Sequence, residues 1–106
     1  MISVLVVGQR EQDLEELPGR HPSVEVLTAH GVEDTMEKLG RNRRIDAVLL
    51  LAGEANPAII GAIREDNPAH PPIYLPAGQP APRGIRTLPT REPAELLDLL
   101  LRELES

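Results

Sequence analysis

The residues capable of metal, nucleophilic or acid–base chemistry are few in this sequence, and their spacing does not group them. There is no cysteine, and the three histidines, His21, His30 and His70, lack the spacing of metal ligands. His30 could act as a base with Thr28 and Glu33 nearby, but an exposed turn residue is the commoner role of such a histidine. No Ser/His/Asp group, cysteine nucleophile or carboxylate pair is found at the expected ligand edge. The sequence therefore predicts a protein that is not an enzyme and that holds no metal or cofactor.

A second set of candidate residues consists of glycines, amides and charged groups that follow short apolar runs. Glycine lets a ligand approach the backbone, and arginine near a helix N-terminus favours an anion. The possible ligand-binding residues are Gln9, Arg10, Gly53, Glu54, Gly78 and Arg91, with Gly8 and Gln79 beside them. The alternative is that the glycines form turns and the arginines face solvent. No GxGxxG or P-loop pattern favours the ligand.

Charge and composition exclude several kinds of partner. The 106 residues carry a net charge of −6, which argues against a nucleic-acid or anionic-membrane surface, since such surfaces need clustered lysine and arginine. The basic cluster at residues 41–44 is the exception, and it suits the solvated C-terminal end of a helix. No apolar run approaches the ~20 residues needed to cross a bilayer. The start of the sequence lacks the features of a signal peptide, and the absence of cysteine fits a reducing cytoplasm.

The element that must position any site is the apolar run at residues 45–51, Ile-Asp-Ala-Val-Leu-Leu-Leu, which is followed by Ala52 and Gly53. Such a run predicts a strand buried on both faces, the central strand of a parallel sheet. Four further strands are expected at residues 2–7, 23–28, 72–75 and 85–88. Helices are expected at residues 9–17, 32–44 and 56–67, and from residue 93 onward. Asn56, and Thr90 or Glu92, are the expected caps of the last two helices.

Five strands alternating with four helices predict one α/β domain over residues 1–106, because each helix supplies the crossover that parallel pairing requires. For a chain of this size we expect the flavodoxin-like strand order 2-1-3-4-5, in a three-layer sandwich. Residues 76–84 read Pro-Ala-Gly-Gln-Pro-Ala-Pro-Arg-Gly, and their prolines are incompatible with a helix. The helix between the fourth and fifth strands is therefore expected to be missing, or replaced by a proline-rich loop.

Three phrases of the sequence give it a resemblance to a known family. Residues 42–50, Asn-Arg-Arg-Ile-Asp-Ala-Val-Leu-Leu, are similar to the start of the third strand in response-regulator receiver domains of the chemotaxis-protein type. Residues 63–75 resemble the third helix and fourth strand of that family, and residues 93–97, Pro-Ala-Glu-Leu-Leu, resemble the start of its last helix. The order and spacing of these phrases extend the resemblance over nearly the whole chain.

The resemblance implies a receiver that has lost its chemistry. Receivers take a phosphoryl group from a histidine kinase onto an aspartate after strand 3, with acids after strand 1 for Mg²⁺, a hydroxyl after strand 4 and a lysine after strand 5. The corresponding positions here hold Gly8 and Gln9, Leu51, Pro76 and Leu88. Asp46 begins the same strand as Leu51 and is expected ~16 Å from the site, and Glu54 alone would make a poor Mg²⁺ site.

These observations predict a non-phosphorylatable, receiver-like protein-interaction module of bacterial signal transduction, a pseudo-receiver. Its partner, or a second copy, is expected at the side of strands 4 and 5 or at the leucine-rich last helix. The possible interface residues are Ile73, Leu75, Ile85 and Leu99. For the helix, ordinary burial in the core is the alternative. A small-ligand or anion-binding domain that uses the loops after the strands is the alternative function.

Overall fold

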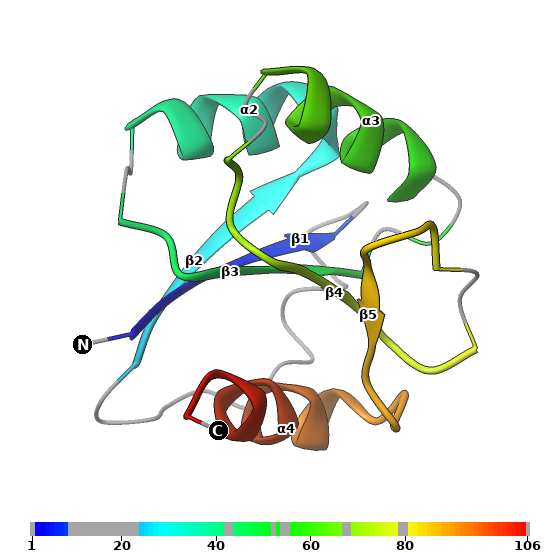
Figure 1. Cartoon of the computed structure of the whole chain (residues 1–106). Coiled ribbons are helices and arrows are strands. Elements are labelled where there is room, and N and C mark those ends of the chain that lie inside the picture. The colour runs from blue at the N-terminus through cyan, green and yellow to red at the C-terminus, as the bar shows by residue number, and fades with distance from the viewer. Residues whose placement is uncertain are drawn as a thin grey trace.

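The computed structural model describes residues 2–8, 24–41, 44–51, 53, 56–66, 69–78 and 81–105. It contains a five-stranded, all-parallel sheet with helices on both faces (Figure 1). The strands are β1 (Ile2–Gly8), β2 (Val24–His30), β3 (Ala47–Leu50), β4 (Ile73–Leu75) and β5 (Arg86–Thr87), and the helices are α2 (Gly31–Arg41), α3 (Asn56–Asp66) and α4 (Pro93–Glu105). The strand order β2-β1-β3-β4-β5 confirms the predicted flavodoxin-like fold.

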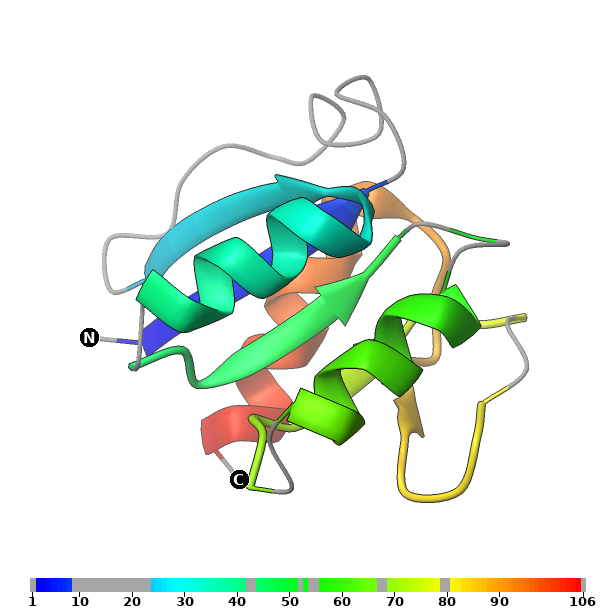
Figure 2. The same ribbon diagram turned by 90° about the horizontal axis from the view of Figure 1, so that it is seen from above.

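The core has two halves, one on each face of the sheet. Successive side chains of a strand point to opposite faces and so enter different halves. Leu5 and Val7 face α2 and α3, whereas Val4 and Val6 face α4. The helices α2 and α3 lie side by side over their face, as Figure 2 shows. Because both faces are covered, the buried part of β1, Val4–Val7, and all of β3 consist of aliphatic residues without polar alternation.

The ends of two strands, β3 and β2, differ from the predicted ends. The strand predicted at residues 45–51 is shorter in the structure, where β3 runs from Ala47 to Leu50. Asp46 still pairs with β1: its N–H donates to the Ser3 carbonyl at 2.8 Å, and its carboxylate accepts the Ser3 N–H at 2.8 Å. Strand β2 continues through the predicted turn to His30, because Gly8 and His30 are still in register.

The helices begin close to the predicted residues, and α2 ends earlier than predicted. Helix α2 begins at Gly31, which has a φ of 80°, and ends at Arg41 rather than at residue 44. The expected caps of α4 act together, since the Glu92 carbonyl accepts the N–H groups of Glu95 and Leu96 while the Glu92 N–H donates to the Thr90 hydroxyl. The helix expected at residues 9–17 lies outside the described residues.

The connection from β4 to β5, residues 76–85, contains no helix in its described residues, 76–78 and 81–85, as its prolines predicted. We call this segment the β4–β5 loop. The Arg64 guanidinium, on the last turn of α3, donates a hydrogen bond to the Arg83 carbonyl. Ile85, at the end of the loop, is 8% exposed and packs into the core beneath α2 and α3. The loop thus covers the face that a crossover helix normally covers.

We expect Asp46→Ala to lower the free energy of unfolding by about 1 kcal/mol, because a charged acceptor of a backbone N–H is lost at an exposed site. Urea denaturation followed by circular dichroism measures this change. The matched control is Glu65→Ala on α3, another exposed acid, which should change the free energy by less than about 0.5 kcal/mol. Equal effects of the two substitutions would contradict the role of Asp46 in holding β1 against β3.

Candidate functional site

The carboxyl edge of the sheet gathers most of the positions that the receiver resemblance singled out. Gly8 ends β1, Leu51 follows β3, Pro76 follows β4 and Leu88 follows β5. Since all the strands are parallel, these positions lie along one edge, which is where ligands bind in open α/β sheets. Gln9 belongs to the same set but lies outside the described residues.

Leu51 is held by the backbone and by the core. Its N–H donates to the Val7 carbonyl at 2.6 Å, and its half-buried side chain packs against the core on the α4 face. Leu88 belongs to the same core, is 2% exposed, and donates its N–H to the Leu75 carbonyl at 2.7 Å. Two aliphatic side chains therefore occupy the positions after β3 and β5, and neither offers a nucleophile or a charge.

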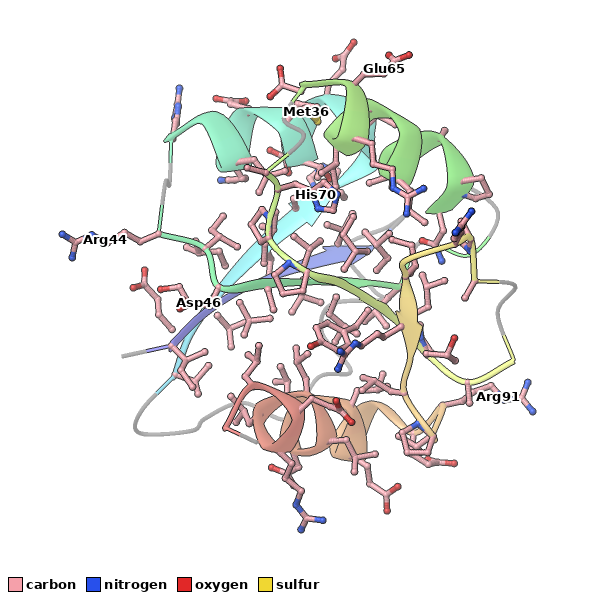
Figure 3. The ribbon with its side chains drawn as sticks, viewed as in Figure 1. Met36, Arg44, Asp46, Glu65, His70 and Arg91 are labelled. Carbon is pink, nitrogen blue, oxygen red and sulfur yellow. The ribbon has the colours of Figure 1, made fainter. Side chains whose placement is uncertain are left out.

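Asp46 lies at the opposite, amino edge of the sheet. Its carboxylate accepts the N–H of Ser3, near the start of β1, and Figure 3 shows it at the end of the sheet far from Arg91. The strand between Asp46 and Leu51 separates the carboxylate from the position of a phosphoryl acceptor. Glu54 lies outside the described residues. Among the described residues, no three histidine, aspartate or glutamate side chains come together as a metal site.

Two of the predicted ligand-binding residues, Gly78 and Arg91, are brought together. Arg91 Nη1 lies 3.4 Å from the position that a Cβ on Gly78 would occupy, and Gly78 has a φ of 87°. The N–H of Ala77 donates to the Thr90 carbonyl at 2.9 Å, which holds the two segments side by side. Arg91 is exposed, and its guanidinium points away from the sheet in Figure 3. Gly53 also has a positive φ, of 58°, whereas Gln9, Arg10 and Glu54 are outside the described residues.

The predicted interface residues are covered by the chain itself. Ile73 and Leu75 are 2% and 0% exposed, and Ile85 is nearly as deeply buried. Leu99 is half-buried and packs against the core on the α4 face, as ordinary core burial of this helix predicts. These four side chains therefore do not form an exposed apolar surface, because the β4–β5 loop and α4 close the core over them. Among the described residues, Val26 is the only exposed large hydrophobic side chain.

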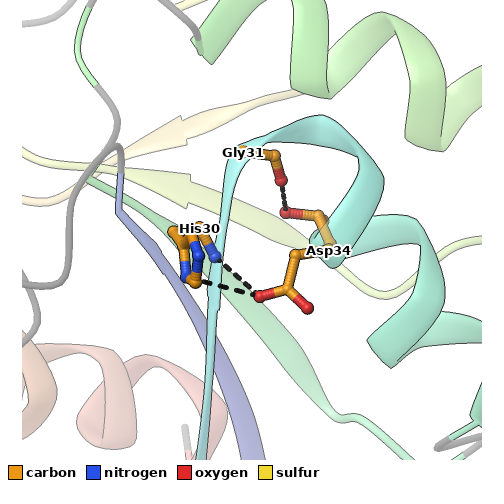
Figure 4. A network of polar contacts seen from close by, with 4 residues as sticks. His30, Gly31 and Asp34 are labelled. Carbon is orange, nitrogen blue, oxygen red and sulfur yellow. Dashed lines mark hydrogen bonds and ion pairs between the residues drawn. The ribbon is translucent and has the colours of Figure 1, made fainter.

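A polar network at the start of α2 was not predicted from the sequence (Figure 4). The N–H of His30 donates to Asp34 Oδ2 at 3.0 Å, and His30 Nδ1 lies 3.6 Å from the same oxygen. The Thr35 hydroxyl donates to the Gly31 carbonyl at 2.7 Å. The acid four residues after His30, in the first helical turn, is the sequence signal for this network. His30 is exposed and lies at the junction of β2 and α2, so the network orders a helix start.

The fold and its edge define a flavodoxin-like α/β domain whose carboxyl edge is aliphatic after β3 and β5. No protein-family model matches the chain, and no curated protein is significantly similar to it. No helix within the described parts of the chain is long and apolar enough to cross a membrane.

We expect Gly78→Ala to lower the free energy of unfolding by about 1 kcal/mol, because alanine is strained at a φ of 87°. The matched control is Gly61→Ala in the middle of α3, where a Cβ meets no atom within 4 Å. This control should raise stability by about 0.5–1 kcal/mol, since alanine is the better helix former. Thermal unfolding should show that Gly78→Ala lowers stability and that Gly61→Ala raises it. A stabilising effect of Gly78→Ala would contradict the described turn.

Proposed function

We propose that this chain is a receiver-like protein-interaction module of bacterial signal transduction, which acts in the cytoplasm without phosphorylation. The observation that carries the proposal is Leu51 at the carboxyl end of β3, in a sheet of the flavodoxin-like order. A leucine has no oxygen that can accept a phosphoryl group. Gly8, Pro76 and Leu88 supply none of the carboxylate, hydroxyl or ammonium groups that the transfer also needs.

The distribution of charge supports a protein partner. A net charge of −6 opposes the approach of nucleic acid and of an anionic membrane surface. The side next to β5 is the surface that we assign to the partner, because Arg83, Arg86 and Thr87 are exposed there. Ile73, Leu75 and Ile85 act as the buried support of this surface. The acid–base pair that the described residues place at the carboxyl edge, His30 and Asp34, orders the start of α2 through the His30 N–H, which supports a binding protein over an enzyme.

The test of a module that works without phosphorylation is exposure to a phosphoryl donor. We expect incubation with acetyl phosphate and Mg²⁺ to leave the intact mass of the chain unchanged, since no acceptor lies at the carboxyl edge. Leu51→Asp is the matched variant, and it should also stay unmodified because acids for Mg²⁺ and the lysine are lacking. An active receiver in the same reaction controls for the donor, and circular dichroism checks that the variant is folded. A phosphoryl group on the wild-type chain would overturn the proposal.

A second candidate function, the binding of a small anion at the carboxyl edge, is favoured by one observation. The exposed Arg91 guanidinium lies against Gly78, so a fixed positive charge stands beside a backbone turn near the start of α4. If this function is right, phosphate or a nucleotide should shift the amide signals of Gly8, Gly53 and Gly78 in a saturable way. Arg91→Gln should abolish those shifts, whereas the control Arg102→Gln on α4 should preserve them. Unmoved amide signals in the wild-type chain would exclude the anion site.

A further inference from the structure

The longest stretch of the sequence without an acidic residue runs from residue 67 to residue 91. Its charged residues are three arginines, Arg83, Arg86 and Arg91, although the whole chain has 17 acids and 11 bases. This stretch includes β4, the β4–β5 loop and β5. One side of an acidic protein is therefore built from a segment that carries positive charge alone.

The structure adds Arg64, from a distant part of the sequence, to Arg83 and Arg86 on this side. Arg64, on α3, donates a hydrogen bond to the carbonyl of Arg83, and its Nη2 lies 3.4 Å from the position of a Cβ on Gly84. Arg83 and Arg86 are exposed, and Arg64 is half-buried. We call these three residues, Arg64, Arg83 and Arg86, the arginine surface. Arg86 lies toward α4, where it pairs with Glu103, and Arg64 lies on α3, so positive charge is spread along the side next to β5. Such a distribution favours an anionic partner.

The described acids near the arginine surface compensate its charge only in part. Glu103 on α4 pairs with Arg86 at 3.2 Å, and the two side chains are 44% and 70% exposed, so solvent screens this pair. Glu65 and Asp66 follow Arg64 on α3, but successive helical residues point in different directions. Figure 3 shows Glu65 at the outer side of α3, pointing away from the sheet. A partner can thus approach Arg83 and Arg86 from solvent.

The geometry of this side indicates which chemistry recognises it. The edge strand β5 is two residues long and lies between Pro82 and Pro89, which limits the pairing of a further strand. The apolar side chains beneath the loop are buried, so they offer little contact area. The groups that this side still offers to a partner are guanidinium groups, which bind carboxylates with paired hydrogen bonds. Charge on the partner, rather than apolar contact or strand addition, must therefore supply the recognition.

We propose that the arginine surface binds a carboxylate-rich segment of a partner protein. The inference rests on the proposed interaction function and names the chemistry of its partner. Arg83 stands on a proline-containing loop that Arg64 fixes to α3, and Arg86 stands on β5, so the partner does not have to order either backbone. The exposed guanidinium groups of Arg83 and Arg86 are the primary contacts, and Arg64 holds the loop that presents them.

The experiment uses a defined probe, a short peptide of alternating glutamate and threonine, titrated into the isotope-labelled full chain at low salt. Saturable shifts of the amide signals of residues 81–88 are expected, and added salt should weaken the binding. The same peptide with glutamine in place of glutamate should produce no shifts. Equal binding of the glutamine peptide, or shifts confined to α2 or β2, would overturn the inference.

Matched variants locate the binding. The double variant Arg83→Gln/Arg86→Gln should raise the dissociation constant of the peptide by about tenfold. The control Arg41→Gln/Arg102→Gln removes the same charge elsewhere and should change that constant by less than about twofold. Arg83→Gln alone is the safer variant for folding, because its carbonyl and not its side chain binds Arg64. Undiminished binding in these variants would refute the arginine surface.

A final comparison distinguishes the binding of an acidic peptide from the binding of nucleic acid. An oligothymidine of similar length should bind more weakly than the glutamate peptide, and tighter binding of it would overturn the inference in favour of nucleic acid. Failure of the peptide would leave the proposed function standing, since that function falls only if the wild-type chain accepts a phosphoryl group.

Discussion

The structure depends on burial of the two central strands on both faces. Val4 to Val7 of β1 and Ala47 to Leu50 of β3 are fully buried, so their backbone groups must pair with neighbouring strands and their side chains must be apolar. Tyr74 is the only aromatic residue of the chain, so aliphatic side chains fill nearly all of this space. The requirement extends beyond the strands, because Leu51 and Leu88 continue the same core past the strand ends.

The same requirement explains how much of the fold could be predicted. Short apolar runs closed by glycine or proline specify the strands, and crossover helices then restrict the strand order to a few arrangements. The ends of the elements depend on partners distant in sequence. Asp46 extends the pairing of β1 because its carboxylate reaches Ser3, 43 residues away. A local pattern cannot contain such a contact, and the strand predicted at residues 45–51 is longer at both ends than β3.

The sequence placed Leu51 and Leu88 at the strand ends, but it did not predict how the side next to β5 is covered. The absence of chemical groups at Leu51 and Leu88 follows from residue type alone, once the strands are placed. The expected apolar interface at Ile73 and Ile85 followed one of two alternatives for the side without a helix, that it is left for a partner rather than covered by the loop alone. The β4–β5 loop instead covers that face, and Ile85 enters the core while Arg64 binds the loop backbone. Hydrophobicity indicated that this face must be covered, but not whether the loop or a partner covers it.

A domain that acts without phosphorylation, as we propose for this chain, cannot change its state by phosphoryl transfer, and this alters how it can carry information. A phosphorylated switch shifts a population between two conformations, and it does so only as far as the phosphoryl group binds them unequally. Without an acceptor, one surface must be sufficient for recognition. A loop stiffened by prolines and tied to α3 through Arg64 suits that role, because little conformational entropy is lost when a partner binds. Control would then come from the abundance or exposure of the partner, and the charge of the arginine surface would decide which acidic segment is accepted.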